Sequence, residues 1–154
     1  MFYLTKIFHF EAAHALAGYD GKCRNIHGHS YELKVTVKGE PIDEPGNPKN
    51  GMVIDFHDLK QIVNEEVVER LDHSFIIGTN MPEDFVESAK RNFDKIVCVA
   101  YQPTTENMLA DFAERIKVKL PQNVDLYSVR LQETRDNFAE WREGWMFCEI
   151  KKKQ

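Results

Sequence analysis

Hydrophobic and polar residues alternate along two stretches near the start of the chain, and alternation is typical of half-buried strands. The first stretch spans residues 2–12, and the second runs from about His29 to Lys38. The apolar side of the first stretch carries Phe8, Phe10, Ala12 and, one step beyond it, His14. The apolar side of the second carries Tyr31, Leu33, Val35 and Val37, preceded on the same parity by His27 and His29. Both strands are therefore predicted to carry histidines on their buried sides.

Two later stretches have the spacing of amphipathic helices. Asp55 is a natural N-cap for the first, which runs to Leu71, and either Thr104 or Thr105 caps the second, which Pro121 ends. The apolar stripe of the first is Phe56, Leu59, Ile62, Val63, Val67 and Leu71. The apolar stripe of the second is Met108, Leu109, Phe112, Ala113, Ile116 and Leu120.

The remaining stretches complete a simple order of elements. A short helix is predicted near Glu83 to Asn92, and a short strand within residues 95–101. A further strand is expected over residues 125–134, and a last one from about Phe138. With no alternation of strands and helices typical of a parallel sheet, we expect an α+β fold: a four-stranded antiparallel sheet with two helices on one face.

Composition narrows the class of protein. A chain of 154 residues, taken as one domain over 1–154, has 42% hydrophobic and 29% charged residues and a net charge of -5, which does not favour nucleic-acid binding. No apolar run is long enough to span a bilayer. Three cysteines, Cys23, Cys98 and Cys148, are an odd number without a secretory leader, so we expect a reducing, cytoplasmic setting.

The segment from Cys23 to His29 is the strongest candidate for chemistry. His27 and His29 are two residues apart, so in a strand their rings lie on one face, and His14 comes from the other predicted strand. If the two strands pair, three neutral imidazoles converge, which is the ligand set of a catalytic zinc whose fourth position stays open. The alternative is a structural zinc with Cys23 as its fourth ligand.

Two further positions carry polar groups that need an explanation. Asp72 and His73 follow the first helix. A hydrogen bond between their side chains requires that the chain has left helical geometry there, because adjacent side chains on a helix do not face each other. The alternative is that His73 only interacts with the helix dipole. Glu133 continues the parity of Tyr127, Val129 and Leu131. A carboxylate on an apolar face is paired or functional, unless it already emerges into solvent.

With these residues laid out, the chain resembles the family of 6-pyruvoyl- and 6-carboxy-tetrahydropterin synthases over nearly its whole length. The matching segments are residues 10–14 (FEAAH), 23–29 (CRNIHGH), 51–56 (GMVIDF), 71–73 (LDH), 103–107 (PTTEN) and 133–134 (ET). The resemblance implies a tunnelling fold, in which subunits join into a trimeric barrel and two trimers form a homohexamer. The sites would lie at subunit interfaces.

The resemblance also implies roles for single residues. His14, His27 and His29 would bind Zn²⁺, Cys23 would be the base, and Asp72 and His73 would relay its proton. Glu133 would anchor the pterin ring, in a pocket lined by Thr104, Thr105 and Glu106. Zinc can hold vicinal hydroxyls as a Lewis acid. A thiol beside a cation, as Cys23 would be, readily loses its proton. A carboxylate such as that of Glu133 accepts two hydrogen bonds from an amino-pyrimidine edge.

Two activities on dihydroneopterin triphosphate share this apparatus. The 6-carboxy enzyme of queuosine synthesis releases acetaldehyde and triphosphate, and the 6-pyruvoyl enzyme of biopterin synthesis eliminates triphosphate. The three-residue gap between Cys23 and His27 and the segment 54–56 resemble the 6-carboxy branch, which is our expectation, whereas segment 133–137 is closer to the 6-pyruvoyl branch. A pterin- or purine-binding module with a structural zinc is the alternative of another class. A generic zinc hydrolase would leave Glu133 and the Asp72–His73 pair unexplained.

Overall fold

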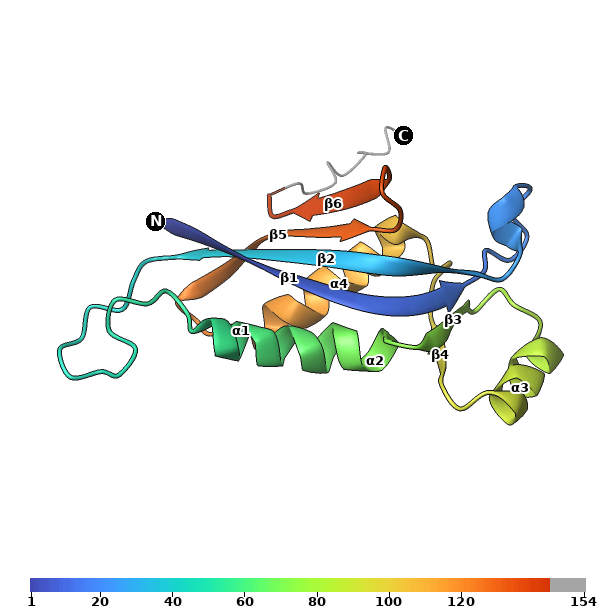
Figure 1. Ribbon diagram of the computed structural model, residues 1–154, viewed down its shortest axis with the longest axis horizontal. Helices are drawn as coiled ribbons and strands as arrows, with labels where there is room; N and C mark the ends of the chain where they lie inside the picture. Colours follow the sequence, from blue (N-terminus) through green and yellow to red (C-terminus); the bar gives the residue numbers. More distant parts are fainter. Residues whose placement is uncertain (145–154) are drawn as a thin grey trace, which may run out of the picture.

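A long, curled sheet forms the body of the molecule in the computed structural model, which describes residues 1–144 (Figure 1). The strands are β1 (Phe2–His14), β2 (His27–Gly39), β3 (Ser74–Gly78), β4 (Ile96–Val99), β5 (Val124–Gln132) and β6 (Phe138–Arg142). Their order across the sheet is β4-β3-β1-β2-β5-β6. The neighbours β1, β2, β5 and β6 pair antiparallel, as the alternation predicted.

The prediction of a four-stranded, purely antiparallel sheet is wrong in two respects. The described sheet has six strands, and β3 runs parallel both to the end of β1 and to β4. The helix α3 (Glu83–Asn92) connects β3 to β4, so these elements form the strand–helix–strand unit that parallel pairing requires. Four or five apolar residues give too short a pattern to reveal such a strand, which is why β3 was missed.

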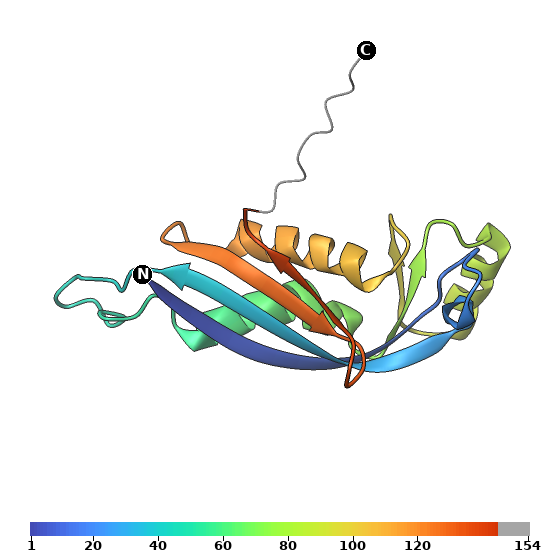
Figure 2. The same ribbon diagram turned by 90° about the horizontal axis from the view of Figure 1, so that it is seen from above.

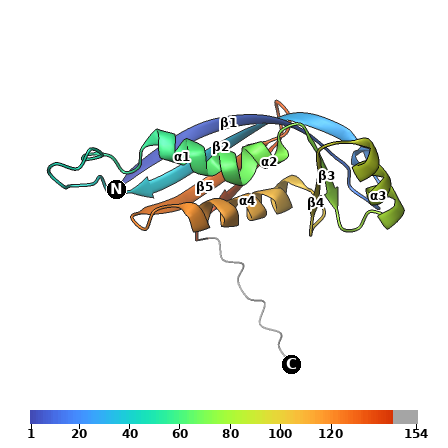
Figure 3. The ribbon, with the colours of Figure 1, turned by 90° about the horizontal axis from the view of Figure 1, so that it is seen from below.

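The two predicted helices lie side by side across one face of the sheet (Figure 3). The first is one continuous helical segment made of α1 (Phe56–Val63), a π-helical stretch η2 (Asn64–Val68) and α2 (Glu69–Leu71). The second is α4 (Thr105–Lys119). The Asp55 carboxylate accepts a hydrogen bond from the backbone N–H of His57, which confirms it as the N-cap. Among the described residues, no helix covers the opposite face of the sheet (Figure 2).

The core fills the space between the sheet and these helices, and most of the predicted parity is confirmed. The buried residues of the strands include Phe8, Phe10, Ala12, Tyr31, Leu33, Val35, Val37, Val129 and Leu131. Those of the helices include Leu59, Val63, Val67, Met108, Leu109, Phe112, Ala113 and Ile116. Deleting a fully buried leucine such as Leu59 typically costs about 2–5 kcal/mol, so this core contributes strongly to the stability of the fold.

Three positions depart from the predicted faces. A bulge in the pairing of β2 with β5 shifts the register between Thr36 and Val37, so Leu126 is buried and Tyr127 packs against Tyr3 on the other face. Phe56 is 47% exposed because it is the first helical residue, lying at the end of the apolar stripe. Cys98 is exposed because β4 is an edge strand, whereas Cys148 lies outside the described residues.

Within residues 1–144, no helix combines the length and the apolar character needed to cross a bilayer.

Candidate metal centre

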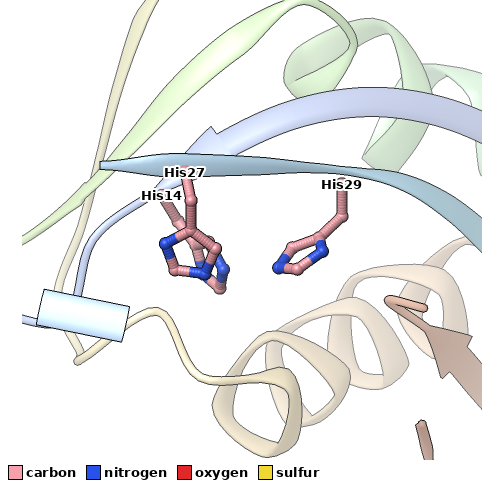
Figure 4. A group of neighbouring side chains, drawn as sticks. All are labelled: His14, His27 and His29. Carbon is pink, nitrogen blue, oxygen red and sulfur yellow. The ribbon is translucent and has the colours of Figure 1, made fainter. Parts of the chain in front are cut away.

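Three histidines meet on the helix-covered side of the sheet, where β1 ends and β2 begins (Figure 4). The register pairs His14 with His27 and places His29 opposite Ala12. The ring centroid of His14 lies 4.6 Å from that of His27 and 5.2 Å from that of His29. One ring nitrogen from each residue lies within 4.8 Å of the others. The predicted convergence is confirmed, and the three side chains can bind a metal ion.

Backbone carbonyls orient two of the rings. His14 Nδ1 lies 2.8 Å from the Pro103 carbonyl oxygen, and His27 Nδ1 lies 2.8 Å from that of Asn25. A carbonyl only accepts, so in each ring Nδ1 carries the hydrogen and Nε2 presents its lone pair. His14 Nε2 is buried and has no hydrogen-bond partner. A nitrogen fixed in this tautomer and without a partner fits a metal ligand.

The surroundings of His14 and His29 favour the neutral form of these two imidazoles. Burial lowers the pKa of His14, and the carbonyl of Pro103 and the charge of Glu133 oppose this without reversing it. Burial likewise lowers the pKa of His29, again against the charge of Glu133. Because only a neutral imidazole has a lone pair to give, these directions favour the ligand form.

Glu133 lies beside the histidines, where β5 has just ended. Its Oε1 atom is 4.0 Å from His14 Nε2, and its side chain is 21% exposed. The register pairs Leu33 with Leu131, so two residues further along Glu133 comes opposite Tyr31. Within residues 1–144, the Glu133 carboxylate is partly buried and forms no ion pair with a Lys or Arg.

Tyr31 is a polar group at this site that the sequence indicated only as core. Its side chain is fully buried and stacks on Phe10 with ring centroids 4.9 Å apart, while its hydroxyl has no hydrogen-bond partner. Burial, and then the charge of Glu133, raise the pKa of Tyr31. A hydroxyl on the buried parity two residues after His29 was the signal that could have drawn attention to it.

The residues predicted to line a pocket begin α4. Thr104 is the N-cap, since its Oγ1 accepts a hydrogen bond from the backbone N–H of Asn107 at 3.3 Å. Thr105 and Glu106 form the first turn. All three follow directly after Pro103, whose carbonyl orients His14. The sequence had not indicated Pro103 or Asn25 as partners of the histidines.

Cys23 lies in a short 3-10 turn, η1 (Lys22–Arg24), in the loop that joins β1 to β2. It is exposed, and its carbonyl accepts a hydrogen bond from the backbone N–H of Leu16 at 2.9 Å. In the described part of the chain, the group of side chains close enough together to hold a metal consists of the three histidines without Cys23. The single chain therefore offers three ligands and leaves the thiol apart from them.

Asp72 and His73 form a pair at the point where α2 ends. Asp72 has an extended ψ of 127° and His73 a positive φ of 57°, so the chain has left helical geometry, as their hydrogen bond requires. His73 Nδ1 lies 3.0 Å from Asp72 Oδ2. Asp72 Oδ1 accepts the backbone N–H of Glu11 at 2.9 Å, and this bond is the main cause that lowers the pKa of Asp72.

The pair is not joined to the other candidate residues within one chain. Within residues 1–144, neither Asp72 nor His73 has a hydrogen bond or ion pair with Cys23 or with the three histidines. His73 lines a shallow groove with Glu11 and Ser30, and His29 lines the same groove. The pair and the histidines therefore lie near one another without a hydrogen bond or ion pair between them.

Comparison with known proteins agrees with this arrangement. The chain is 37% identical to the 6-carboxy-5,6,7,8-tetrahydropterin synthase of Haemophilus influenzae, over 93% of this chain and 100% of that one. It is 32% identical to the enzyme of that name from Aquifex aeolicus, over 91% and 97% of the two chains. The structure of Caenorhabditis elegans 6-pyruvoyl tetrahydropterin synthase matches with a TM-score of 0.64 and 28% identity, over 92% of this chain and 94% of that one.

A solved structure from Wolinella succinogenes matches with a TM-score of 0.72 at 22% identity, over 92% and 98% of the two chains, and shows the shared fold. The family model described as 6-pyruvoyl tetrahydropterin synthase matches residues 3–144. That range includes the three histidines, Cys23, the Asp72–His73 pair and Glu133. The chain belongs to the 6-pyruvoyl tetrahydropterin synthase family.

Proposed function

We propose that the protein is a zinc-dependent lyase that converts 7,8-dihydroneopterin triphosphate to 6-carboxy-5,6,7,8-tetrahydropterin, with release of acetaldehyde and triphosphate. The observation that carries the proposal is the cluster of three imidazoles, two of them held by backbone carbonyls in the tautomer that presents Nε2. Relatives named for the 6-carboxy activity that are 30–37% identical over most of the chain support this branch.

The 6-pyruvoyl activity is the second candidate. A 6-pyruvoyl tetrahydrobiopterin synthase of Drosophila melanogaster is 33% identical over 79% of this chain and 62% of that one. Segment 133–137, Glu-Thr-Arg-Asp-Asn, also resembles that branch. Because this chain has sequence identities of this size to relatives in both branches, the two activities have to be distinguished by the product that the protein forms.

In the proposed mechanism, the three histidines hold Zn²⁺, which would supply a Lewis acid for the vicinal hydroxyls of the substrate side chain. Glu133 accepts two hydrogen bonds from the amino-pyrimidine edge of the pterin, for which an ionised carboxylate is the matching partner. Thr104, Thr105 and Glu106 line the same pocket from the start of α4, beside the carbonyl that orients His14.

Proton transfer belongs to Cys23 and to the Asp72–His73 pair. Cys23, as the thiolate, takes a proton from the substrate and becomes a thiol, and the Asp72–His73 pair then accepts this proton. Asp72 holds the imidazole of His73 through Nδ1, which leaves Nε2 of His73 free to exchange a proton. Two exposed thiols, Cys23 and Cys98, suit a reducing compartment, so we place the reaction in the cytoplasm.

We infer that the histidine cluster and the Asp72–His73 pair meet between subunits. β3 pairs with only the last three residues of β1, so within residues 1–144 the edge of β1 from Phe2 to Glu11 and the outer edge of β6 are open. The Asp72–His73 pair is bonded to Glu11, at the end of that open edge. A neighbouring β6 that pairs along β1 would bring the rest of its subunit beside the pair.

Product analysis tests the proposed reaction. Purified protein incubated with 7,8-dihydroneopterin triphosphate should yield 6-carboxy-5,6,7,8-tetrahydropterin together with acetaldehyde and triphosphate, all identified by mass. Formation of 6-pyruvoyl tetrahydropterin without acetaldehyde would assign the other branch. Binding without turnover would favour the pterin-binding module.

Removal of one ligand tests the metal centre. His27→Ala should abolish near-stoichiometric zinc and activity but leave a folded protein, since the core does not depend on this side chain. His9→Ala is the matched control, because the His9 side chain is 70% exposed on the other face, and it should keep its zinc. Unchanged zinc content in His27→Ala, measured by elemental analysis, would exclude the site.

The family resemblance implies a hexamer made of two trimeric rings. Pairing of β6 with the β1 of the next subunit could close each ring, because both strands lie next to an open edge. Such an assembly would also cover Phe2, Tyr3 and Phe138, each more than half exposed. Sedimentation at micromolar concentration should therefore give a hexamer, and a monomer alone would contradict the proposal.

Cys23→Ala separates a base from a ligand. If Cys23 is the base, the Cys23→Ala protein should keep its zinc content. Its turnover should fall by about 10²-fold to 10⁴-fold, the usual contribution of a positioned proton-transfer group. Cys98→Ala is the matched control, because Cys98 is also exposed but lies on β4, and it should be fully active. Loss of zinc in Cys23→Ala would instead identify a fourth ligand.

A further inference from the structure

His14 and the residues after it are held at two points by one short segment. The carbonyl of Pro103 accepts a hydrogen bond from His14 Nδ1 at 2.8 Å. The side chain of the preceding residue, Gln102, donates from Nε2 to the carbonyl of Ala17 at 3.1 Å. Residues 102 and 103 therefore fix both the last residue of β1 and the backbone three residues beyond it.

Asn80 joins a third segment to this pair of contacts. Its Nδ2 donates to the same Ala17 carbonyl at 3.2 Å and also bonds Gln102 Oε1. The turn that carries Asn80 starts at Gly78, where an added Cβ would lie 2.6 Å from the Tyr101 carbonyl oxygen. The chain after β3 thus packs directly against residues 101–103, with no room for a side chain between them.

The other end of the segment is fixed to α4. The carbonyl of Gln102 accepts the backbone N–H of Thr104 at 2.7 Å and Asn107 Nδ2 at 2.9 Å. Pro103 between them has a φ locked by its ring. The carbonyl of Pro103 therefore has little freedom to rotate away from His14 as long as Gln102 stays in place.

We propose that Asn80 and Gln102 are positioning residues of the metal centre, which hold the Pro103 carbonyl on His14 Nδ1 and so aim His14 Nε2 at the ion. This inference rests on the proposed metal centre and is independent of the pterin chemistry. It gives a function to the segment between β3 and α4, whose end at Gln102 supports the metal ligand from outside the histidine cluster.

A merely structural contribution predicts a different result. A side-chain amide that donates a hydrogen bond to a carbonyl contributes modestly to stability wherever it lies. Asn123 offers a matched control, because its Nδ2 donates to the carbonyl of Val53 at 3.3 Å. It precedes β5 and packs beside Gly39, at the end of β2 remote from His27. Its loss should lower stability without reaching the metal.

The experiment measures zinc release from the full-length, zinc-loaded protein to an excess of a chromogenic chelator. The Gln102→Ala and Asn80→Ala proteins should release zinc about 3-fold to 10-fold faster than the unaltered protein. This effect is smaller than the loss of about 10-fold to 100-fold in metal affinity that is typical when a direct hydrogen-bond partner of a ligand is removed. Asn80→Asp keeps the shape but removes the donor, so it should behave like Asn80→Ala. Asn123→Ala should stay within about twofold at a similar loss of stability.

The Co²⁺-substituted protein gives a second measurement. Visible absorption of bound Co²⁺ reports ligand geometry and should change in Gln102→Ala but not in Asn123→Ala. Release rates equal to that of the unaltered protein, or equally raised in Asn123→Ala, would overturn the inference. An unaltered protein that binds no zinc would instead overturn the metal centre itself.

Discussion

The antiparallel register of β1 and β2 is the constraint on which the rest of the structure depends. The ladder runs without a shift from Phe2 opposite Gly39 to His14 opposite His27. Because side chains alternate between the two faces, a slip of one residue would turn His14 and Phe10 away from the core together. The same pairing that buries the apolar residues therefore also brings the three imidazoles together.

At the metal centre two electrostatic effects oppose each other, and burial prevails. Glu133 lies 4.0 Å from His14 Nε2 and favours its protonation, yet the pKa of His14 is lowered. Removal of water from the imidazolium costs more than one partly exposed carboxylate returns. A carboxylate can therefore lie close to His14 while the pKa of His14 stays below its ordinary value.

The features that could be predicted from the sequence are those that depend on the spacing of apolar and polar side chains. The histidine cluster, the two long helices, Asp55 as N-cap and the buried sides of β1 and β2 all follow from spacing and are confirmed. The short strand β4 was predicted, but β3 and its parallel pairing with β4 were not, because a stretch of five residues is too short to show a period. The bulge that turns Tyr127 outward is likewise a single inserted residue, invisible in an alternating pattern.

The partners of the imidazoles could not be predicted for another reason. The groups that orient His14 and His27 are the carbonyls of Pro103 and Asn25, and every residue has a carbonyl. Only the folded backbone selects these two. The roles of Cys23, Asp72 and His73 come from the family resemblance and stay predictions, since one chain does not join them.

The bond between His14 and Pro103 also bears on the order in which the site is assembled. His14, His27 and His29 lie within sixteen residues of sequence, whereas Pro103 is 89 residues from His14. Contacts distant in sequence close larger loops and tend to form later in folding. A chain that has emerged from the ribosome only as far as the end of β2 already contains all three imidazoles. It still lacks the carbonyl that decides which nitrogen of His14 is free.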